Sequence, residues 1–74
     1  MRVKETYKIS IGSFVRIKYD NGLLDGILVE NEKDSIDVKV FFPMDDTLDE
    51  VYRDQIYKVG KRIELNFDNS GLVD

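Results

Sequence analysis

The feature that most limits how this chain can fold is a period of two in its apolar residues, repeated over several short segments. Residues 13–19 and 36–42 each carry an apolar side chain at every second position, mostly with charged or polar side chains between them. This pattern is typical of β-strands that bury one face. No segment of about 10 or more residues has a convincing 3.6-residue period, which an amphipathic helix would show. The sequence therefore predicts an all-β fold.

Turn-forming residues separate the predicted strands closely in the first half of the chain. Asn21-Gly22 is typical of a tight hairpin turn, because both residue types tolerate positive φ angles. A second strand is expected over residues 23–30, and Gly26 inside it marks a bulge or a sharp bend. Residues 31–34 are polar and predict the turn that leads into the third strand.

The second half of the chain is predicted to continue with shorter elements. Pro43 cannot donate a ladder hydrogen bond, so the third strand should end there. Residues 44–50 are rich in acids and predict a loop, followed by a short strand over residues 51–53. Residues 54–56 are expected to form a single 3₁₀ turn before a further strand at residues 57–59.

The 74-residue chain is expected to form a single domain, since a chain of this length holds one small core. That core is predicted to cover about residues 11–67, with residues 1–10 as an N-terminal extension and residues 68–74 as a C-terminal tail. Within the extension, residues 2–9 are a candidate extra strand beside residues 62–67. The expected number of short antiparallel strands is therefore five to six.

Composition indicates where such a small domain works. Hydrophobic residues make up 42% of the chain, which is enough for one compact core, and no cysteine is present to add disulfides or thiolate zinc ligands. The lack of cysteine fits a reducing compartment. No apolar run approaches the roughly 18 residues of a membrane span, and the N-terminus lacks the apolar stretch of a signal peptide. We therefore expect a cytoplasmic protein that does not engage a membrane.

The net charge of −4 is unevenly distributed along the chain. Residues 1–19 carry five basic residues and one acid, whereas residues 20–57 carry eleven acids and three basic residues. An acidic middle segment attracts cationic partners and repels phosphate backbones, so nucleic acid is a disfavoured ligand. The expected partner is a protein with a basic surface.

The residue inventory removes the commonest catalytic chemistries. Without histidine or cysteine, no serine has an activating base and no thiolate is present. The acids at positions 45, 46, 49 and 50 are the remaining carboxylate set, but a small chain scarcely provides the cleft that paired carboxylates need. The same segment fails as a calcium loop, because Glu50 stands where that loop requires glycine. We expect no enzyme activity, no metal site and no cofactor.

The order of features over about residues 11–59 resembles SH3-like small barrels of the Tudor and KOW kind. Residues 11–17 are similar to their G-x-x-V-x-V opening, and residues 26–29 to their glycine-bent second strand. Residues 37–42 resemble the third strand, and residues 51–59 the short fourth strand, the 3₁₀ turn and the fifth strand. The resemblance implies a small SH3-like (Tudor/KOW-like) barrel that binds peptides, proteins or RNA without catalysis.

Tudor domains that read methylated lysine or arginine hold the cation in an aromatic cage, and the resemblance places Tyr19, Phe41 and Tyr52 nearest to its positions. The chain departs from that pattern because it has no tryptophan and no aromatic residue at positions 20–25. Some bacterial transcription regulators use similar barrels to hold RNA polymerase. By this analogy the chain is expected to act as an acidic adaptor or inhibitor of a larger complex, including transcription machinery.

The predicted function is a non-catalytic protein-interaction module. Tyr19 and Phe42 are in phase with the buried faces of their strands and are expected in the core, whereas other aromatic residues are out of phase and available for contact. The predicted partner-binding residues are the acids Asp45, Asp46, Asp49 and Glu50 and the aromatics Phe14, Phe41 and Tyr52.

Two alternatives remain open at this point. The first is a nucleic-acid-binding barrel, in which Arg16, Lys18 and Lys39 would contact phosphates while Phe14 and Phe41 stack on bases. The second is a structural subunit held in an oligomer through exposed strand edges.

Overall fold

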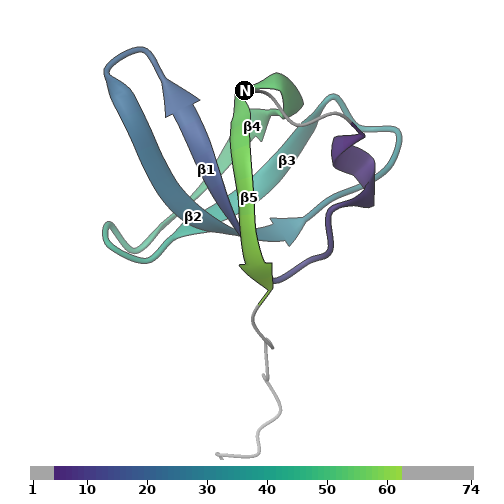
Figure 1. The fold of residues 1–74 in the computed structure, drawn as a ribbon, viewed down its shortest axis with the longest axis horizontal. Helices are drawn as coiled ribbons and strands as arrows, with labels where there is room; N and C mark the ends of the chain where they lie inside the picture. Colours follow the sequence, from purple (N-terminus) through teal and green to yellow (C-terminus); the bar gives the residue numbers. More distant parts are fainter. Residues whose placement is uncertain (1–4, 63–74) are drawn as a thin grey trace, which may run out of the picture.

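The computed structural model describes residues 5–62, which form five β-strands and two short 3₁₀ helices (Figure 1). The elements in chain order are η1 Thr6–Lys8, β1 Ser13–Tyr19, β2 Gly22–Glu30, β3 Asp37–Phe42, β4 Thr47–Tyr52, η2 Arg53–Gln55 and β5 Ile56–Arg62. The predicted all-β fold of short antiparallel strands is confirmed, with five strands in these residues. No helix in this part of the chain is long and apolar enough to cross a membrane.

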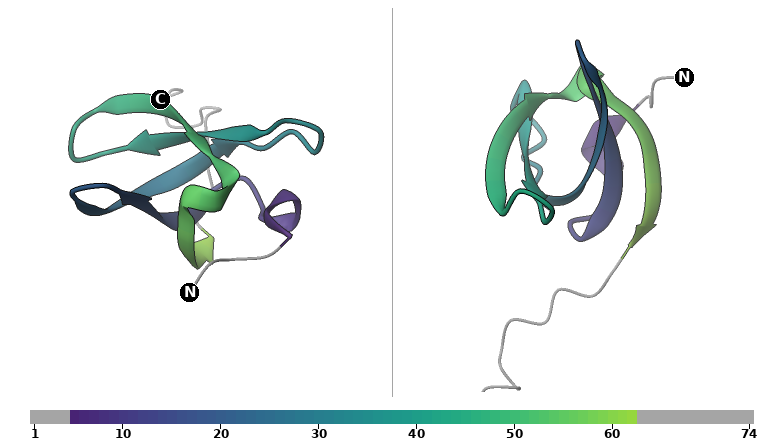
Figure 2. Two further views of the ribbon diagram at one scale, coloured as in Figure 1. Left: turned by 90° about the horizontal axis from the view of Figure 1, so that it is seen from above. Right: turned by 90° about the vertical axis from the view of Figure 1, so that its left-hand side faces the viewer.

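The five strands form one antiparallel sheet in the order β4-β3-β2-β1-β5. Consecutive strands from β1 to β4 are neighbours, and β5 returns to the free side of β1. The sheet curls strongly on itself, with β4 and β5 at its two ends (Figure 2). Because β4 and β5 do not pair with each other in residues 5–62, the sheet is not closed into a barrel there.

The curl is centred on β2, which pairs with β1 along its first part and with β3 along its last part. A Cβ atom added at Gly26 would lie 2.5 Å from Val40 Cγ1 and 2.8 Å from the Phe41 carbonyl oxygen. Only glycine lets β3 approach β2 this closely. Gly26 itself stays in register with β1, and the irregularity in pairing with β3 comes later, between Leu28 and Glu30. The predicted bend is therefore a close backbone approach rather than a bulge at the glycine.

Alternate residues of β1, β3 and the neighbouring elements fill the concave side of the sheet. The buried core consists of Val15, Ile17, Leu28, Val38, Val40, Phe42, Val51 and Ile56. Burying a side chain of this size stabilises the fold by about 1.5–3 kcal/mol. The period of two in the sequence correctly predicted which residues of β1 and β3 point into the core. Ile36 is an exception, since it precedes the first residue of β3 and is 70% exposed.

The β1–β2 turn is a tight hairpin connection, as predicted, but its backbone differs in detail. Tyr19 pairs with Gly22, so two residues make the turn. Only Gly22 takes a positive φ, of 143°, while Asn21 does not. Glycine therefore supplies the unusual angle on entry into β2, where an L-residue would be strained.

The prediction of an acidic loop at residues 44–50 is wrong in its second half. β4 already begins at Thr47, so Asp49 and Glu50 lie in a strand, and Phe42 pairs with Thr47 across a four-residue turn. Asp46 has a φ of 52° and closes that turn in the left-handed region, which aspartate tolerates better than most residues. An edge strand accepts charged side chains on its exposed positions, so a high density of acids does not by itself exclude a strand.

The part of the predicted strand 2–9 that the structure describes, residues 5–9, is not a strand, because η1 occupies Thr6–Lys8. Part-buried hydrogen bonds hold this 3₁₀ turn in place. The Asn31 amide donates to the carbonyl oxygens of Thr6, at 3.0 Å, and Ile9, at 2.9 Å. The predicted partner segment 62–67, apart from Arg62 at the end of β5, and the predicted tail 68–74 lie outside the described residues.

Arg53, the first residue of η2, connects three segments that are far apart in the sequence. Its guanidinium donates to the Ser35 carbonyl oxygen at 2.6 Å, to Asn31 Oδ1 at 2.7 Å and to Thr6 Oγ1 at 3.2 Å, and also to the Glu32 carbonyl oxygen. All four acceptors are uncharged. Arg53 thus binds η1 and the β2–β3 loop to η2 without neutralising any nearby carboxylate.

Candidate functional site

The convex side of the sheet carries an apolar row that crosses four strands. Phe14 of β1 lies opposite Ile27 of β2, Ile27 lies opposite Phe41 of β3, and Phe41 lies opposite Leu48 of β4. Phe14 is 39% exposed and Leu48 is 58% exposed, while Ile27 and Phe41 are half-buried. Side chains directly opposite each other in an antiparallel sheet have Cβ atoms about 4.5–5.5 Å apart. We call these four residues the apolar row.

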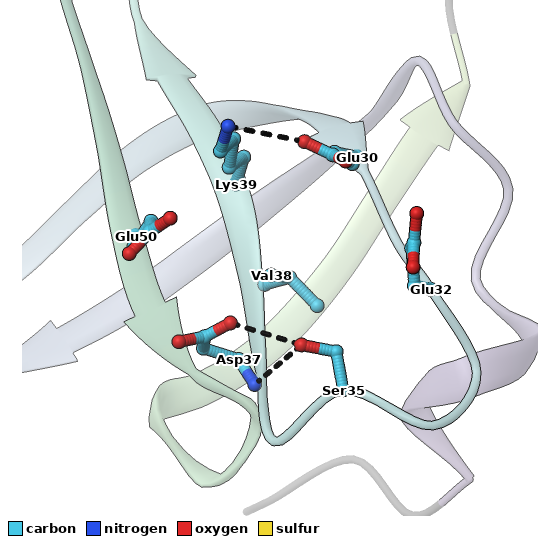
Figure 3. Close-up of a pocket in the computed structure, with 7 residues that line it drawn as sticks. All are labelled: Glu30, Glu32, Ser35, Asp37, Val38, Lys39 and Glu50. Atoms are coloured by element: carbon cyan, nitrogen blue, oxygen red, sulfur yellow. Dashed lines mark hydrogen bonds and ion pairs between the residues drawn. The ribbon is translucent and has the colours of Figure 1, made fainter.

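An acidic pocket lies beside the apolar row, on the outer surface of β2, β3 and β4 (Figure 3). Its volume is about 200 Å³, and four of its seven lining residues are carboxylates facing one lysine. The Lys39 amine lies 3.3 Å from Glu30 Oε1, whereas Glu50, the register neighbour of Lys39 on β4, has no such contact. The pocket is lined by Glu30, Glu32, Ser35, Asp37, Val38, Lys39 and Glu50.

The structure separates the four acids that were predicted to form one partner-facing cluster. Asp45 and Asp46 lie in the exposed β3–β4 turn, and Glu50 lies in the acidic pocket. Asp49 differs, because its carboxylate accepts a hydrogen bond from the Tyr19 hydroxyl at 3.2 Å and another from the Glu50 backbone N–H at 3.0 Å. Asp49 therefore has an intramolecular role that the other three acids lack.

Tyr19 is half-buried on the concave side, where its ring lies 6.2 Å from that of Phe42 in a tilted arrangement. Burial raises the pKa of the Tyr19 hydroxyl above its usual range, and the neighbouring Asp49 carboxylate raises it further. The hydroxyl therefore stays protonated and acts as a hydrogen-bond donor to Asp49.

The predicted aromatic contact residues occupy different places. Phe14 and Phe41 belong to the apolar row, and Tyr52, 58% exposed, lies at the far end of β4 beside a cavity of about 290 Å³ that Ile36 also lines. Tyr19 and Phe41 lie on opposite faces of the sheet. Tyr19, Phe41 and Tyr52 therefore do not converge on one cage.

The three basic residues considered for phosphate contact are also dispersed. Arg16 makes a bidentate contact with Asp25, its direct neighbour on β2, at 2.7 and 3.1 Å. This hydrogen bonding raises the pKa of Arg16 and lowers that of Asp25. Lys39 is paired with Glu30, and Lys18 is exposed at the end of β1. Two of the three cations are thus already matched by carboxylates.

The free edge of β4 is partly occupied by side chains. The Glu50 N–H donates to Asp49 Oδ1 at 3.0 Å, and the Tyr52 N–H donates to Gln55 Oε1 at 2.8 Å. These donors are two residues apart, the spacing at which an edge strand points N–H groups away from its neighbour. Sequence reasoning missed the role of Gln55, although a side-chain acceptor three residues after a strand end is a recognisable capping signal.

Within residues 5–62, no group of three or more histidine, cysteine, aspartate or glutamate side chains is placed to hold a metal ion. The carboxylates of the acidic pocket therefore do not form a metal centre in the described structure. Comparison of the chain with models of protein families, with curated proteins and with solved structures finds no match.

Proposed function

We propose that this chain is a non-catalytic protein-interaction module that binds a basic surface of a larger protein or complex. The observation that carries the proposal is an excess of carboxylates without ion pairs along β3, the β3–β4 turn, β4 and η2. In residues 5–62, the ion-paired carboxylates are those of Glu5, Asp25 and Glu30. The acids of β3, β4, η2 and the β3–β4 turn make no ion pair with the described residues: Asp37, Asp45, Asp46, Asp49, Glu50 and Asp54.

Like charges that outnumber the cations of one region repel one another and oppose folding, unless a cationic partner meets them. The nearby cations do not serve this purpose, because Lys39 is paired with Glu30 and Arg53 is bonded to uncharged oxygens. A complementary basic surface would relieve the repulsion. It would also raise the association rate by about 10-fold to 1,000-fold at low ionic strength.

We also propose that the module is an SH3-like barrel of the Tudor or KOW kind. The proposal is supported by the succession of β1 to β4 as neighbours, by the pairing of β5 with β1, and by the 3₁₀ helix η2 directly before β5. Proteins with such barrels bind peptides, proteins or RNA, so the fold agrees with a binding role without naming the partner.

The two alternatives receive less support from the geometry. A nucleic-acid surface needs free cations near exposed aromatic residues, but Arg16 and Lys39 are each paired with a carboxylate. A subunit joined through the edge of β4 would have to displace the side-chain hydrogen bonds at Glu50 and Tyr52.

Affinity capture from the cells that produce the protein tests the proposed function with three baits. The test bait carries Asp45→Lys and Glu50→Lys, and it spares Asp46 for its left-handed backbone and Asp49 for its hydrogen bonds. The matched control carries Asp20→Lys and Asp34→Lys, which change the net charge equally at exposed positions away from the β3–β4 hairpin.

The wild type and the control bait should retain the same protein partner, and the test bait should lose it. Added salt should weaken the wild-type complex. Equal retention by the test bait would contradict the proposal, and recovery of nucleic acid in place of a protein would support the alternative.

A further inference from the structure

We infer that Leu48, at the β4 end of the apolar row, and the acidic pocket together bind one extended segment of the partner, in which apolar side chains alternate with a lysine or arginine. The inference rests on the proposed function and adds the chemical pattern of the partner. The segment would lie along β4 on the convex face, with an apolar side chain on Leu48, a basic side chain over Glu50 and a second apolar side chain on Tyr52.

The apolar row is not required to complete the core. Val15, Leu28 and Val40, which lie next to row residues in sequence, point to the concave side and are at most 1% exposed. The solvent face of an antiparallel sheet ordinarily carries polar side chains. A line of four apolar residues across four strands therefore adds little to sealing the core and leaves Phe14 and Leu48 in contact with water.

The spacing on β4 matches that of an extended peptide. Leu48, Glu50 and Tyr52 are successive outward positions, so their Cα atoms are about 7 Å apart from one to the next. An extended peptide presents its side chains on one face with the same spacing. The complementary pattern is thus apolar, any residue, basic, any residue, apolar.

Charge selects a basic residue for the middle position. The acidic pocket beside Glu50 has four carboxylates and one amine, and that amine is already 3.3 Å from Glu30. On the other side of the apolar row, the Arg16–Asp25 pair is self-neutralised. Net negative charge therefore flanks the β3–β4 end of the row, through the acidic pocket and through the exposed Asp45 and Asp46, while the β1–β2 end is neutral, which places the cation of the segment on β4.

A second copy of this chain is a poor occupant. A two-fold interface centred on Glu50 would place acidic pocket against acidic pocket. Strand addition is opposed as well, because the Glu50 and Tyr52 N–H groups already donate to side chains. Docking through side chains on the face of the sheet avoids both obstacles.

The test is a titration of the isotope-labelled full chain, followed by NMR, with three capped nonapeptides. The first is Gly-Ser-Leu-Ser-Lys-Ser-Leu-Ser-Gly, the second replaces both leucines with serine, and the third replaces lysine with glutamate. We expect the first peptide to shift the backbone amide signals of Phe41, Leu48 and Glu50. The serine peptide should bind at least about fivefold more weakly, and the glutamate peptide should not bind.

A matched pair of variants locates the site. Leu48→Ser should weaken binding of the first peptide at least about fivefold, whereas Leu23→Ser should leave it unchanged. Leu23 is 48% exposed on the same face but lies opposite Lys18, away from the row. Both leucines are exposed, so both variants should keep the wild-type spectrum elsewhere.

The possible failures are distinguishable. Equal binding of the leucine and serine peptides, with shifts confined to the acidic pocket, would overturn the role of the apolar row and leave the proposed function standing. Equal binding of the glutamate peptide would overturn the charge selection on which both proposals depend. Shifts that follow Leu23 rather than Leu48 would place the segment elsewhere and overturn the inference.

Discussion

The β1–β2 and β3–β4 hairpins are both antiparallel pairs of adjacent strands, but they differ in charge balance: residues 13–30 carry two basic residues and three acids, whereas residues 37–52 carry one basic residue and five acids. In the first, the strand register places Arg16 directly opposite Asp25, and the two side chains neutralise each other. In the second, Lys39 lies opposite Glu50 but its amine turns to Glu30 on β2, so Glu50 stays unpaired in the described structure. The comparison teaches that register alone does not neutralise a surface, because a lysine with an acid opposite it on each neighbouring strand pairs with one of them and leaves the other available for a partner.

The largest expected effect comes from disturbing the junction between the two hairpins. Gly26→Ala should lower the free energy of unfolding by about 3 kcal/mol, because the new methyl group would overlap Val40 and the Phe41 carbonyl oxygen. Urea denaturation measures the change. Gly60→Ala is the control, since its Cβ atom would lie 3.3 Å from Phe14 Cβ and should cost much less. Equal losses would mean that β3 does not need this close approach.

The next effect concerns Arg53, the cation on the β3–β4 side that is bonded to uncharged oxygens. Arg53→Met should lower the free energy of unfolding by about 2 kcal/mol, since it leaves several part-buried acceptors without a donor. Hydrogen exchange at the Ser35 amide should also accelerate as the β2–β3 loop loosens. Arg62→Met, which removes one exposed hydrogen bond to Ile11, should change stability by no more than about 0.5 kcal/mol. A stable Arg53→Met variant with unchanged exchange would rule out the connecting role.

A smaller effect should separate two acids of the β3–β4 hairpin. Asp49→Lys should cost about 1 kcal/mol, because it removes the acceptor for the Tyr19 hydroxyl and for the Glu50 N–H. Asp45→Lys should change the free energy of unfolding by no more than about 0.5 kcal/mol, because that side chain is exposed in the turn. Thermal unfolding of both variants provides the measurement, and identical melting curves would show that the two acids are equivalent.

The smallest expected effect concerns the Arg16–Asp25 pair of the β1–β2 hairpin and is seen at low pH. Arg16 holds the pKa of Asp25 below its ordinary value of 3.8. The stability that Asp25 contributes is therefore present above its unfolded pKa and is lost as the pH falls through the lower folded pKa. Asp25→Asn should remove this part of the acid dependence, and the loss should be small because the pair is exposed.

Thermal melts at falling pH, together with an NMR titration of the Asp25 carboxyl group, follow this contribution. Asp20→Asn, in the β1–β2 turn, controls for the loss of one negative charge. An Asp25 carboxyl group that titrates at its ordinary value would refute the prediction.

The strands that alternate cleanly were predictable from local sequence. Val15, Ile17, Val38 and Val40 are buried as their period of two requires, because an inward side chain on these strands has no other place than the core. Ile36 continued the same pattern by chance, but it precedes the strand and is exposed. A local pattern gives the phase of a strand more reliably than its ends.

The features that were missed depend on contacts between distant segments. The first four residues of β4 were mistaken for a loop because their acids obscured the alternation, and their place became apparent only through the register with β3. The apolar row joins residues from four strands, so none of its members indicates the row by itself. The contact between Arg53 and Thr6 spans 47 residues and leaves no local signal. The sequence therefore predicted which kinds of residue the candidate surface contains, but not how the fold brings them together.

The side-chain caps on β4 also bear on how this protein behaves when it is concentrated. Fibrils grow when a new strand joins backbone groups that have no partner, and small strand-rich proteins are especially prone to it. Here an incoming chain would first have to break the bonds from Asp49 and Gln55 to the edge of β4. It would then have to bring its own acids against those of the hairpin. Aggregation along β4 is thus opposed by both hydrogen bonding and charge.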